Sequence, residues 1–468
     1  MKVAFVHYHL KTGGVGTVIQ QQAAALHGVC SILVLTGDRA GADMPCAVVE
    51  IPELGYDRRE TVPPDPNHVA EKMLQAISDA WPGGCDILHI HNPTLAKNRQ
   101  YLQIIKRLQR TGINLLLQLH DLAEDGRPDA YFDESYPADC HYGVINKRDA
   151  RILEAAGLKR TGLHHLPNAV RGFPSASVRT PASHILYPVR AIRRKNLGEA
   201  FLLSLMFNQG ERLVVTQPPN SPADLASYRD WIGWAREASL HVDFEAGRKV
   251  NFAALVGRSR SVLTTSVAEG FGLAFLEPWT AGKLLWGRKL ADICTDFEEN
   301  GICLGSLYDR LDIPLSWIDV DGFARDWHAA VDRASARYGH AIAKEAATNA
   351  FTRMTAGNRV DFGLLSEKFQ RQVLARLTAL PAQKRELVGL NPWLANPGMV
   401  SDSGALIASN RQAVRRQYSL KRYRSRLLEI YQQVDRHAVH HRIDKRALHD
   451  AFFDLDRFSL LKWGPYES

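Results

Sequence analysis

The stretch that decides the fold runs from Thr265 to Gly282 and has the sequence TSVAEGFGLAFLEPWTAG. It overlaps a short apolar run, Ser261–Thr265, whose β-branched residues are typical of a buried strand. A helical pattern follows the glycines, so the stretch predicts a turn from a strand into a helix. Glu269 then lies at the carboxyl end of the strand, and Glu277 lies at most about two helical turns later.

This turn has the composition of an anion-binding site. Its glycines allow the backbone to turn tightly and to approach a ligand closely. Backbone amides at a helix N-terminus attract phosphate, and the residues that would supply them here are Gly270, Phe271, Gly272 and Leu273. The two nearby carboxylates can accept hydrogen bonds from hydroxyl groups. The stretch therefore predicts a site for a nucleoside diphosphate, and the alternative is an ordinary turn with two solvated acids.

The first third of the chain alternates short apolar runs with helical patterns, which predicts a doubly wound parallel α/β sheet. The expected strands are Lys2–His7, Ser31–Thr36, Asp86–His91, Asn114–His120 and His141–Asn146, and two expected helices are Thr17–Leu26 and Lys147–Ala156. Polar residues collect at the strand ends, among them His7, His91, Asn92 and His120. Because ligands bind at the carboxyl ends of such strands, these residues predict a binding cleft.

The alternation breaks at Arg171–Ser183, a stretch rich in proline and serine that predicts a linker. A second α/β alternation follows, with expected strands His184–Val189, Arg212–Thr216, His241–Glu245 and Ser261–Thr265 and expected helices Asn196–Phe207 and Asp224–Glu237. From about Val331 the pattern is helical and charged, without strand signals. We expect an α/β domain at 1–175, a second at 184–330, and a helical extension at 331–468 that packs on the domains or crosses between them.

The composition is that of a globular protein in solution, with 468 residues of which 45% are hydrophobic and 23% charged. No apolar run approaches the ~18 residues of a membrane helix, and the N-terminus predicts a strand rather than a signal peptide. Six cysteines without a Cys-x-x-Cys motif indicate reduced thiols. We expect a cytoplasmic protein, and its net charge of +8 is compatible with a peripheral contact at the inner membrane face.

Basic residues concentrate at Arg415–Arg426 with tyrosines between them, as in some nucleic-acid binders. However, Tyr423, Leu427 and Leu428 recur at near-helical spacing, which favours a packed helix face with a charged back. We therefore expect no nucleic-acid partner.

Two further groups of residues are suited to phosphate. Gly13 and Gly14 form a glycine turn between the first strand and the first helix, without the spacing of the dinucleotide-binding fingerprint. Arg190 and Lys195 follow the first strand of the second domain, where a guanidinium and an ammonium can both hold phosphate oxygens. The two positions before Lys195 are also arginines, so the assignment of charges stays open, and a solvated basic loop is the alternative.

In their order and spacing these motifs resemble those of the retaining glycosyltransferases with two Rossmann-like domains, that is, the GT-B fold of glycosyltransferase family 4 (group 1). The matching residues are Gly13-Gly14, His120-Asp121, Pro167-Asn168-Ala169-Val170, Arg190 with Lys195, and Glu269 with Glu277. The resemblance covers residues 2 to about 290. It implies two doubly wound domains facing across a cleft, and transfer of a sugar from a nucleoside diphosphate sugar to an acceptor hydroxyl, with no further cofactor.

The resemblance also implies roles for these residues. The donor diphosphate would be held in the second domain by Arg190, Lys195 and the amides of residues 270–273, and the ribose by Glu277. Glu269 would support the sugar ring, and His120 would hold the sugar from the first domain, so these two are the expected catalytic residues.

The glycine pair at 13 and 14 would close over the donor. The acceptor is a small metabolite, a glycan or a lipid-linked sugar, and its expected contacts are Asn92 and Arg127 in the loops 92–99 and 124–127.

Parts of the sequence depart from the family pattern. Ala169 replaces a usual glycine, and the stretches 283–288 and 290–305 differ from the usual ones, which leaves the donor sugar open. Two Asp-x-Asp pairs at 319–321 and 454–456 match a motif of metal-dependent transferases, but that motif belongs to a single-domain fold and neither pair follows a strand of the expected cleft. The spacing of the histidines 437, 440, 441 and 449 fits no common zinc site. We predict no metal site.

Two alternatives share these features. The first is another enzyme on the same architecture, a phosphorylase or a nucleotide-sugar epimerase. The second is a non-catalytic binder of nucleotide sugars or polyanions that uses the basic tail.

Overall fold

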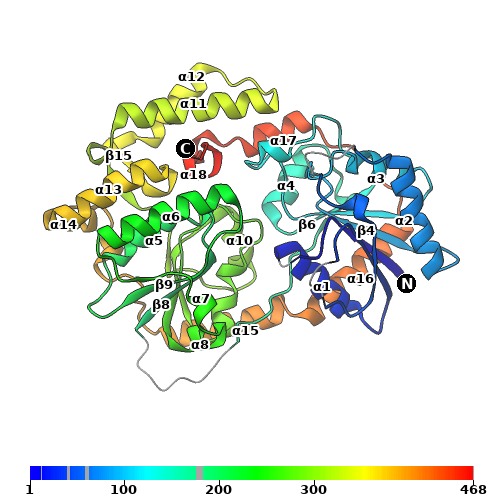
Figure 1. Cartoon of the computed structure of the whole chain (residues 1–468), viewed down its shortest axis with the longest axis horizontal. Coiled ribbons are helices and arrows are strands. Elements are labelled where there is room, and N and C mark those ends of the chain that lie inside the picture. Colours follow the sequence, from blue (N-terminus) through cyan, green and yellow to red (C-terminus); the bar gives the residue numbers. More distant parts are fainter. Residues whose placement is uncertain (12, 40–42, 58–62, 175–182, 467–468) are drawn as a thin grey trace. The chain divides into compact units, whose positions relative to one another are not determined.

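The computed structural model describes residues 1–11, 13–39, 43–57, 63–174 and 183–466, and the chain divides into two compact units (Figure 1). Unit 1 comprises Met1–Ala169 with Arg416–Phe453, and unit 2 comprises Val170–Arg415 with Asp454–Ser468. The C-terminal extension is thus divided between the two units. Most of the predicted linker, residues 175–182, lies outside the described residues.

Unit 1 contains a seven-stranded parallel sheet with the strand order β3-β2-β1-β4-β5-β6-β7. This is the order of a doubly wound Rossmann-like sheet, in which the direction of strand addition reverses between β1 and β4. The strands are β1 (Lys2–His7), β2 (Ser31–Thr36), β3 (Ala47–Glu50), β4 (Ile87–His91), β5 (Leu115–Leu119), β6 (His141–Val144) and β7 (Leu163–His165). The predicted sheet is confirmed, and β3 and β7 are additional short strands.

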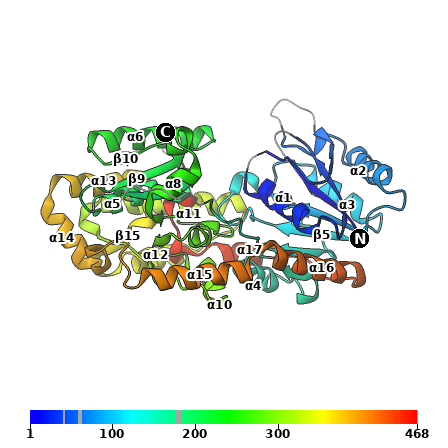
Figure 2. The same ribbon diagram turned by 90° about the horizontal axis from the view of Figure 1, so that it is seen from below.

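Helices cover both faces of this sheet (Figures 1 and 2). One face packs against α2 (Pro66–Ala80), α3 (Tyr101–Gln109), α4 (Lys147–Ala155) and α17 (Lys445–Phe452). The other face packs against α1 (Gly14–Leu26) and α16 (Leu420–Arg436). Alternate strand residues serve the two faces, so that Ala4 and Val6 belong to the first core and Val3 and Phe5 to the second.

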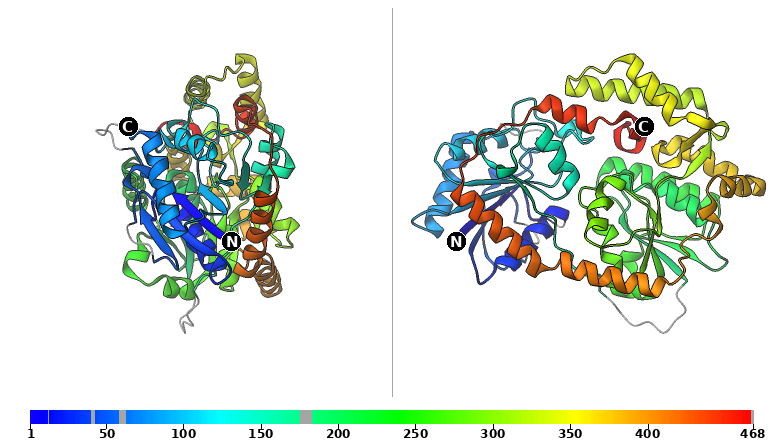
Figure 3. Two further views of the ribbon diagram at one scale, coloured as in Figure 1. Left: turned by 90° about the vertical axis from the view of Figure 1, so that its right-hand side faces the viewer. Right: turned by 180° about the vertical axis from the view of Figure 1, so that it is seen from behind.

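Helix α16 is therefore part of the unit 1 core, although it comes from the C-terminal extension. It lies beside α1, as the orange-red helix in the right panel of Figure 3 shows. Tyr423, Leu427 and Tyr431 are fully buried against the sheet, whereas Lys421 and Arg422 are exposed. The packed face with a charged back that the sequence predicts is confirmed.

Replacing Leu427 by alanine is expected to lower the free energy of unfolding of unit 1 by about 2–3 kcal/mol, because a buried leucine is replaced by a cavity. Urea unfolding followed by tyrosine and tryptophan fluorescence measures this. Leu420, on the same helix but 44% exposed, provides the control, since its replacement by alanine should change the free energy by less than about 0.5 kcal/mol. Equal effects of the two variants would contradict the burial of α16.

Unit 2 repeats the architecture with a six-stranded parallel sheet in the order β10-β9-β8-β11-β12-β13. Here the reversal lies between β8 and β11. The strands are β8 (His184–Arg190), β9 (Arg212–Gln217), β10 (Val242–Asp243), β11 (Ser259–Thr264), β12 (Leu284–Arg288) and β13 (Leu307–Tyr308). Strand β12 arises from the stretch 283–288, which departs from the family pattern, so the sheet is kept although the sequence differs.

The helices of unit 2 include α5 (Leu197–Ser204), α6 (Pro222–Glu237), α7 (Ala246–Lys249), α8 (Phe252–Arg258), α9 (Glu277–Thr280) and α10 (Ala291–Glu299). The extension adds α11 (Val320–Tyr338), α12 (Lys344–Met354), α13 (Glu367–Ala379), α14 (Pro381–Leu390), most of α15 (Ser403–Gln417) and α18 (Leu460–Trp463). One expectation was wrong, because the extension is not free of strands: β15 (Arg359–Asp361) pairs antiparallel with β14 (Asp312–Pro314). Three residues are too few to give a periodic signal in the sequence.

Polar residues that cap helices explain several helix starts. The side chains of Asn146, Ser221 and Asp319 accept hydrogen bonds from backbone amides in the first turns of α4, α6 and α11. Asp319 belongs to one of the Asp-x-Asp pairs, so its carboxylate has a structural role in ending a loop and starting a helix.

Candidate active site

The basic turn after β8 contains three cations, Arg193, Arg194 and Lys195, and each contacts a different partner. The Arg193 guanidinium is buried and pairs with the Glu367 carboxylate at 2.8 Å. Arg194 Nη1 donates to the carbonyl oxygen of Ala268 at 3.2 Å, and the Lys195 ammonium pairs with the Glu269 carboxylate. Arg193 is thus a structural residue, whereas Lys195 contacts Glu269 directly and Arg194 Nη1 lies 3.9 Å from the same carboxylate.

The backbone of this turn is held in place by two hydroxyl groups. Tyr187 Oη donates to the carbonyl oxygen of Lys195, and Thr265 Oγ1 lies 2.9 Å from the same oxygen and 3.0 Å from that of Asn196. Val267 N donates to the carbonyl oxygen of Arg194 at 3.0 Å. These contacts join the ends of β8 and β11, where the strand order reverses and where doubly wound sheets bind ligands.

Glu269 is a buried carboxylate whose charge is compensated. Burial alone would raise the pKa of Glu269, but the positive charges of Lys195 and Arg194 outweigh it and hold this pKa below its ordinary value. Only 9% of the side chain is exposed. The carboxylate is therefore ionised at neutral pH and fixed in position by Lys195.

The helical pattern predicted after Glu269 corresponds to two short elements, a 3₁₀ turn at Leu273–Phe275 and the four-residue helix α9. Gly272 has φ +85°, and a Cβ there would lie 2.7 Å from the Phe275 ring. Glycine is required at this position by backbone conformation and by packing.

Glu277 is largely buried, and its carboxyl group makes no hydrogen bond or ion pair with any residue that the structure describes. Burial raises the pKa of Glu277 to about 8, against the opposing effect of the Lys195 charge. An acid in this state lacks the hydrogen-bond partners that buried polar groups normally have. The Glu277 carboxyl group is therefore suited to form hydrogen bonds with hydroxyl groups of a ligand.

Arg190, the last residue of β8, is exposed and its guanidinium has no hydrogen-bond or ion-pair partner among the described residues. The structure pairs Lys195 with Glu269 and brings the Lys195 charge close enough to oppose the rise in the pKa of Glu277, while Arg190 ends the strand that precedes this turn. Cations of this kind can hold phosphate oxygens, and carboxylates can accept hydrogen bonds from hydroxyl groups.

In unit 1, His120 follows β5 and is 5% exposed. Its Nε2 lies 2.9 Å from Nδ1 of His91, and its backbone amide donates to Oδ1 of Asn92 at 2.7 Å. Asn92 has φ +51°, and its Oδ1 also accepts from the amide of Asp121. The Asn92 side-chain oxygen is thus occupied in shaping the His120 loop, which is a structural use that the sequence did not indicate.

The other predicted residues of unit 1 lie at the same carboxyl edge of the sheet. Arg127 Nη2 donates to Asp121 Oδ1 at 2.7 Å, so its charge is partly neutralised. Gly13 caps α1 with an extended backbone, and a Cβ on Gly14 would meet no atom within 4 Å. These two glycines are therefore not required by the packing of the described chain, in contrast to Gly272.

Three contributors to the site were not predicted as site residues: Tyr187, Arg194 and Thr265. His91 was one of the polar strand-end residues that predicted the cleft, and Thr265 could have been found by the same signal because it directly follows a strand. Tyr187 and Arg194 act through a hydroxyl and a guanidinium that only the folded chain brings to their partners.

Among the described residues, no group of three or more histidine, cysteine or acidic side chains is arranged to hold a metal ion. Asp454 caps a 3₁₀ turn and Asp456 pairs with Arg353. Across that part of the chain, no helix is long and apolar enough to cross a membrane.

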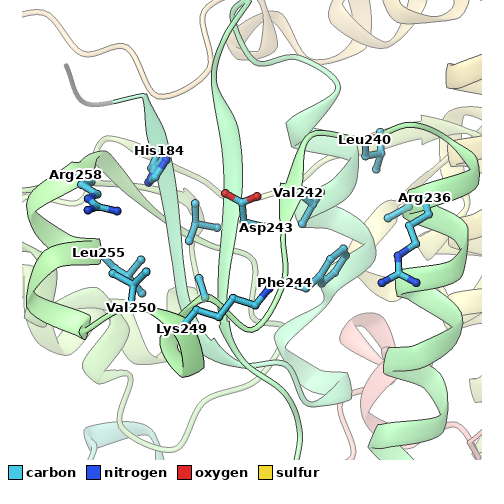
Figure 4. Close-up of a pocket in the computed structure, with 13 residues that line it drawn as sticks. His184, Arg236, Leu240, Val242, Asp243, Phe244, Lys249, Val250, Leu255 and Arg258 are labelled. Atoms are coloured by element: carbon cyan, nitrogen blue, oxygen red, sulfur yellow. The ribbon is translucent and has the colours of Figure 1, made fainter. Parts of the chain in front are cut away.

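A separate cavity of about 390 Å³ lies at the amino end of the unit 2 sheet (Figure 4). It is lined by the start of β8, the ends of α6 and α8, and residues around β10, including His184, Arg236, Asp243, Lys249 and Arg258. None of the predicted site residues lines it. Strands begin at this edge, so the cavity is distinct from the β8/β11 site at the carboxyl edge.

The chain was compared with known proteins. No protein-family model matches it. The mannosylglucosyl-3-phosphoglycerate synthase of Petrotoga mobilis is 24% identical over 488 residues, which cover 92% of this chain and 90% of that protein.

Solved structures with the same fold share little sequence with the chain. The sucrose-phosphate synthase of Thermosynechococcus elongatus has a TM-score of 0.53 at 14% identity, covering 92% of this chain and 98% of that one. HepE of Anabaena in complex with UDP-glucose has a TM-score of 0.52 at 12% identity, covering 92% and 99%. A glycosyltransferase of Rickettsia africae has a TM-score of 0.52 at 10% identity, covering 93% and 98%. With its two doubly wound parallel sheets, the chain has the GT-B fold that these solved structures share.

Proposed function

We propose that the protein transfers a sugar from a nucleoside diphosphate sugar to a hydroxyl group of a small anionic acceptor, with retention of the anomeric configuration. The observation that carries the proposal is the β8/β11 site of unit 2. There an ionised Glu269 is fixed by Lys195, beside an unpartnered Glu277 and an exposed Arg190.

The donor half of the reaction is assigned to unit 2. Arg190 and Lys195 are proposed to hold the diphosphate and to stabilise the charge that develops on it as the bond to the anomeric carbon breaks. Glu277 is proposed to accept hydrogen bonds from the ribose hydroxyls. Glu269 is proposed to lie near the sugar ring, where a carboxylate supports positive charge at the anomeric carbon.

The group transfer balances without a further reactant. The bond from the anomeric carbon to the diphosphate oxygen breaks, and a bond to the acceptor oxygen forms on the same face of the ring. The acceptor proton passes to the departing diphosphate. No dedicated base is therefore needed, which agrees with the residues gathered in unit 2.

The acceptor class is proposed from the curated relative, whose name describes a product that carries 3-phosphoglycerate. In unit 1, Lys97 and Arg127 both lie in loops at the carboxyl edge of the sheet. Lys97 has no ion-pair partner among the described residues, and its ammonium lies 6.0 Å from the centre of the Tyr56 ring. A cation next to an aromatic ring suits an acceptor that joins a phosphate to a sugar.

The proposal is tested by titrating the purified protein with UDP, GDP and ADP sugars, with the nucleotides alone and with inorganic phosphate. The expected result is binding of one nucleotide sugar, followed by transfer to a phosphoglycerate glycoside with the anomeric coupling of the donor retained in NMR spectra of the product. Binding of phosphate alone would favour a phosphorylase, and binding without turnover would favour a non-catalytic binder. An inverted anomeric coupling would contradict the retaining mechanism.

Replacing Arg190 by alanine is expected to weaken nucleotide-sugar binding by about 10–100-fold, the cost of one hydrogen bond to a charged group. Stability should not change, because the side chain is exposed. Isothermal titration measures the affinity. Arg236 is an exposed arginine of the same unit outside the site, and its replacement by alanine should leave the affinity unchanged.

The affinity for the nucleotide sugar is expected to rise with pH from about 6 to about 8, by up to about tenfold per unit, and then to level off. The pKa of Glu277 is about 8, so below this pH the carboxyl group is protonated, and only the ionised form accepts hydrogen bonds from both ribose hydroxyls. A nucleotide sugar is the right probe because its diphosphate diester does not titrate in this range. Glu277→Gln should abolish the pH dependence, and a wild-type affinity independent of pH would contradict the role of Glu277.

A further inference from the structure

Three histidine rings are stacked in the core of unit 1, and the last of them is His120. The His89 and His91 ring centres are 4.5 Å apart with an interplanar angle of 20°. The His91 and His120 ring centres are 5.2 Å apart at 14°. The rings come from β4 and from the end of β5, which are adjacent strands of the sheet.

All three rings are neutral at physiological pH. Burial lowers the pKa values of His89 and His120 to about 3, and lowers that of His91 as well. Each ring therefore carries one proton, and one nitrogen donates while the other accepts. The position of that proton is decided by the hydrogen-bond partners.

The partners of His89 fix its proton. Its Nε2 lies 2.9 Å from Gln118 Oε1, which also accepts from Gln22 Nε2 at 2.8 Å. Its Nδ1 lies 2.9 Å from Tyr431 Oη on α16. An amide oxygen only accepts, so Nε2 of His89 carries the proton and Nδ1 accepts from the tyrosine.

The hydrogen bond between His91 and His120 allows two arrangements. If His91 donates, its own Nε2 is an unprotonated nitrogen, and His120 carries its proton on Nδ1. If His120 donates, the His91 proton must lie on Nε2. That atom is buried without a hydrogen-bond partner, so the second arrangement leaves a buried N–H unpaired. Buried unpaired N–H groups are rarer in proteins than buried unpaired acceptors.

We propose that His91 is a positioning residue that donates its Nδ1–H to Nε2 of His120 and so holds His120 as the Nδ1–H tautomer. The Nδ1 atom of His120 makes no hydrogen bond within the part of the chain that the structure describes, and it is not among the fully buried atoms. His120 therefore presents a hydrogen-bond donor to solvent and ligand. It is a donor to sugar oxygens and not an acceptor from sugar hydroxyls.

The role of His120 in sugar binding rests on the proposed function, whereas the assignment of its tautomer does not. The tautomer is tested without any substrate by ¹⁵N NMR of the protein labelled at histidine nitrogens, in which protonated and unprotonated ring nitrogens have well-separated shifts. The expected spectrum has His120 protonated at Nδ1, and His91→Leu should shift it towards the Nε2–H tautomer. A wild-type His120 protonated at Nε2, or a spectrum unchanged in His91→Leu, would overturn the proposal.

The matched control is a second histidine pair in the same unit. His141 Nδ1 lies 2.9 Å from His164 Nε2, with the rings 5.1 Å apart at 16°. His141→Leu removes an equivalent hydrogen bond from another strand pair and should leave the His120 signals in place. A shift of the His120 signals in this control would show that such substitutions act by general disturbance of unit 1.

The consequence for transfer is tested with two variants of His91. His91→Leu should lower kcat for transfer by about tenfold, since a donor to the sugar is lost in part of the molecules. His91→Asn keeps an N–H near the Nδ1 position and should restore most of that rate together with the Nδ1–H signal of His120. If the His120 tautomer shifted as expected in His91→Leu but neither the wild type nor any variant transferred sugar, the proposed function would be contradicted and the tautomer proposal would stand. If His91→Leu and His91→Asn lowered kcat equally, the proposal that His91 acts by donating its Nδ1 proton would be overturned.

Discussion

Replacing Lys195 by methionine is expected to lower kcat/KM for sugar transfer by about 10²–10³-fold, which corresponds to the loss of one preorganised charge that stabilises the transition state. The Lys195 ammonium is the cation that the turn after β8 brings to the Glu269 carboxylate. Its loss removes a charge from the proposed diphosphate site and also frees Glu269 from its fixed position. Steady-state kinetics with the nucleotide sugar found by titration measures the effect.

Two further variants separate catalysis from stability. Lys195→Met leaves the buried Glu269 carboxylate with the more distant Arg194, at 3.9 Å, as its ion-pair partner among the described residues, so the free energy of unfolding should fall by a few kcal/mol. The double variant Lys195→Met with Glu269→Gln removes that buried charge and should recover stability while staying inactive. Lys249→Met removes one positive charge at an exposed lysine outside the site, and so it controls for the change in net charge. Activity of Lys195→Met within about threefold of the wild type would contradict the role of Lys195.

Replacing Arg288 by methionine is expected to lower the free energy of unfolding of unit 2 by about 3–5 kcal/mol, because two buried carboxylates lose their cation. Arg288 Nη2 lies 2.7 Å from oxygens of both Glu199 and Asp361. Tyr308 Oη donates to Glu199 Oε1 at 2.6 Å, and Asn196 Nδ2 donates to Glu199 Oε2 at 2.7 Å. The network joins β12, α5 and β15, so its loss affects the sheet and the extension together.

The measurement is urea unfolding combined with hydrogen exchange followed by mass spectrometry, which assigns the lost protection to unit 2. Arg310 pairs with Asp312 at 2.8 Å but is 52% exposed, so Arg310→Met should cost less than about 1 kcal/mol. An equal effect of the two substitutions would contradict the importance of burial. Because Asn196 adjoins Lys195, Arg288→Met should also weaken donor binding at temperatures where unit 2 remains folded.

The fold class was predictable from the sequence because parallel strands buried on both faces are nearly continuous apolar runs. The bounds of β1 and β2 agree with the predicted Lys2–His7 and Ser31–Thr36. Strands of two or three residues, such as β10, β13 and β15, have too little periodicity to define their ends. The helical pattern predicted after Gly270 is present only as two short elements, the 3₁₀ turn Leu273–Phe275 that follows the positive φ of Gly272 and the helix α9.

Within the site, residue types could be predicted but charge assignment could not. Three successive cations, Arg193, Arg194 and Lys195, are equivalent in the sequence. Glu367 in the extension, 174 residues later, pairs with Arg193, and that contact leaves Lys195 for Glu269. Likewise the contacts of the Asn92 oxygen could not be read from the sequence, since its Oδ1 accepts from the amides of His120 and Asp121, and the expected acceptor contact stays a prediction.

The sequence by itself determined the two α/β alternations and the positions of the polar residues at strand ends, since both follow from local periodicity and from the rule that parallel strands share one carboxyl edge. Only the tertiary structure decided that Lys195 neutralises Glu269, that Glu277 is largely buried with no hydrogen-bond partner among the described residues, and that α16 belongs to the core of unit 1. The physical reason is that pKa values, tautomers and ion pairs depend on burial and on distances of a few ångströms between residues that are far apart along the chain.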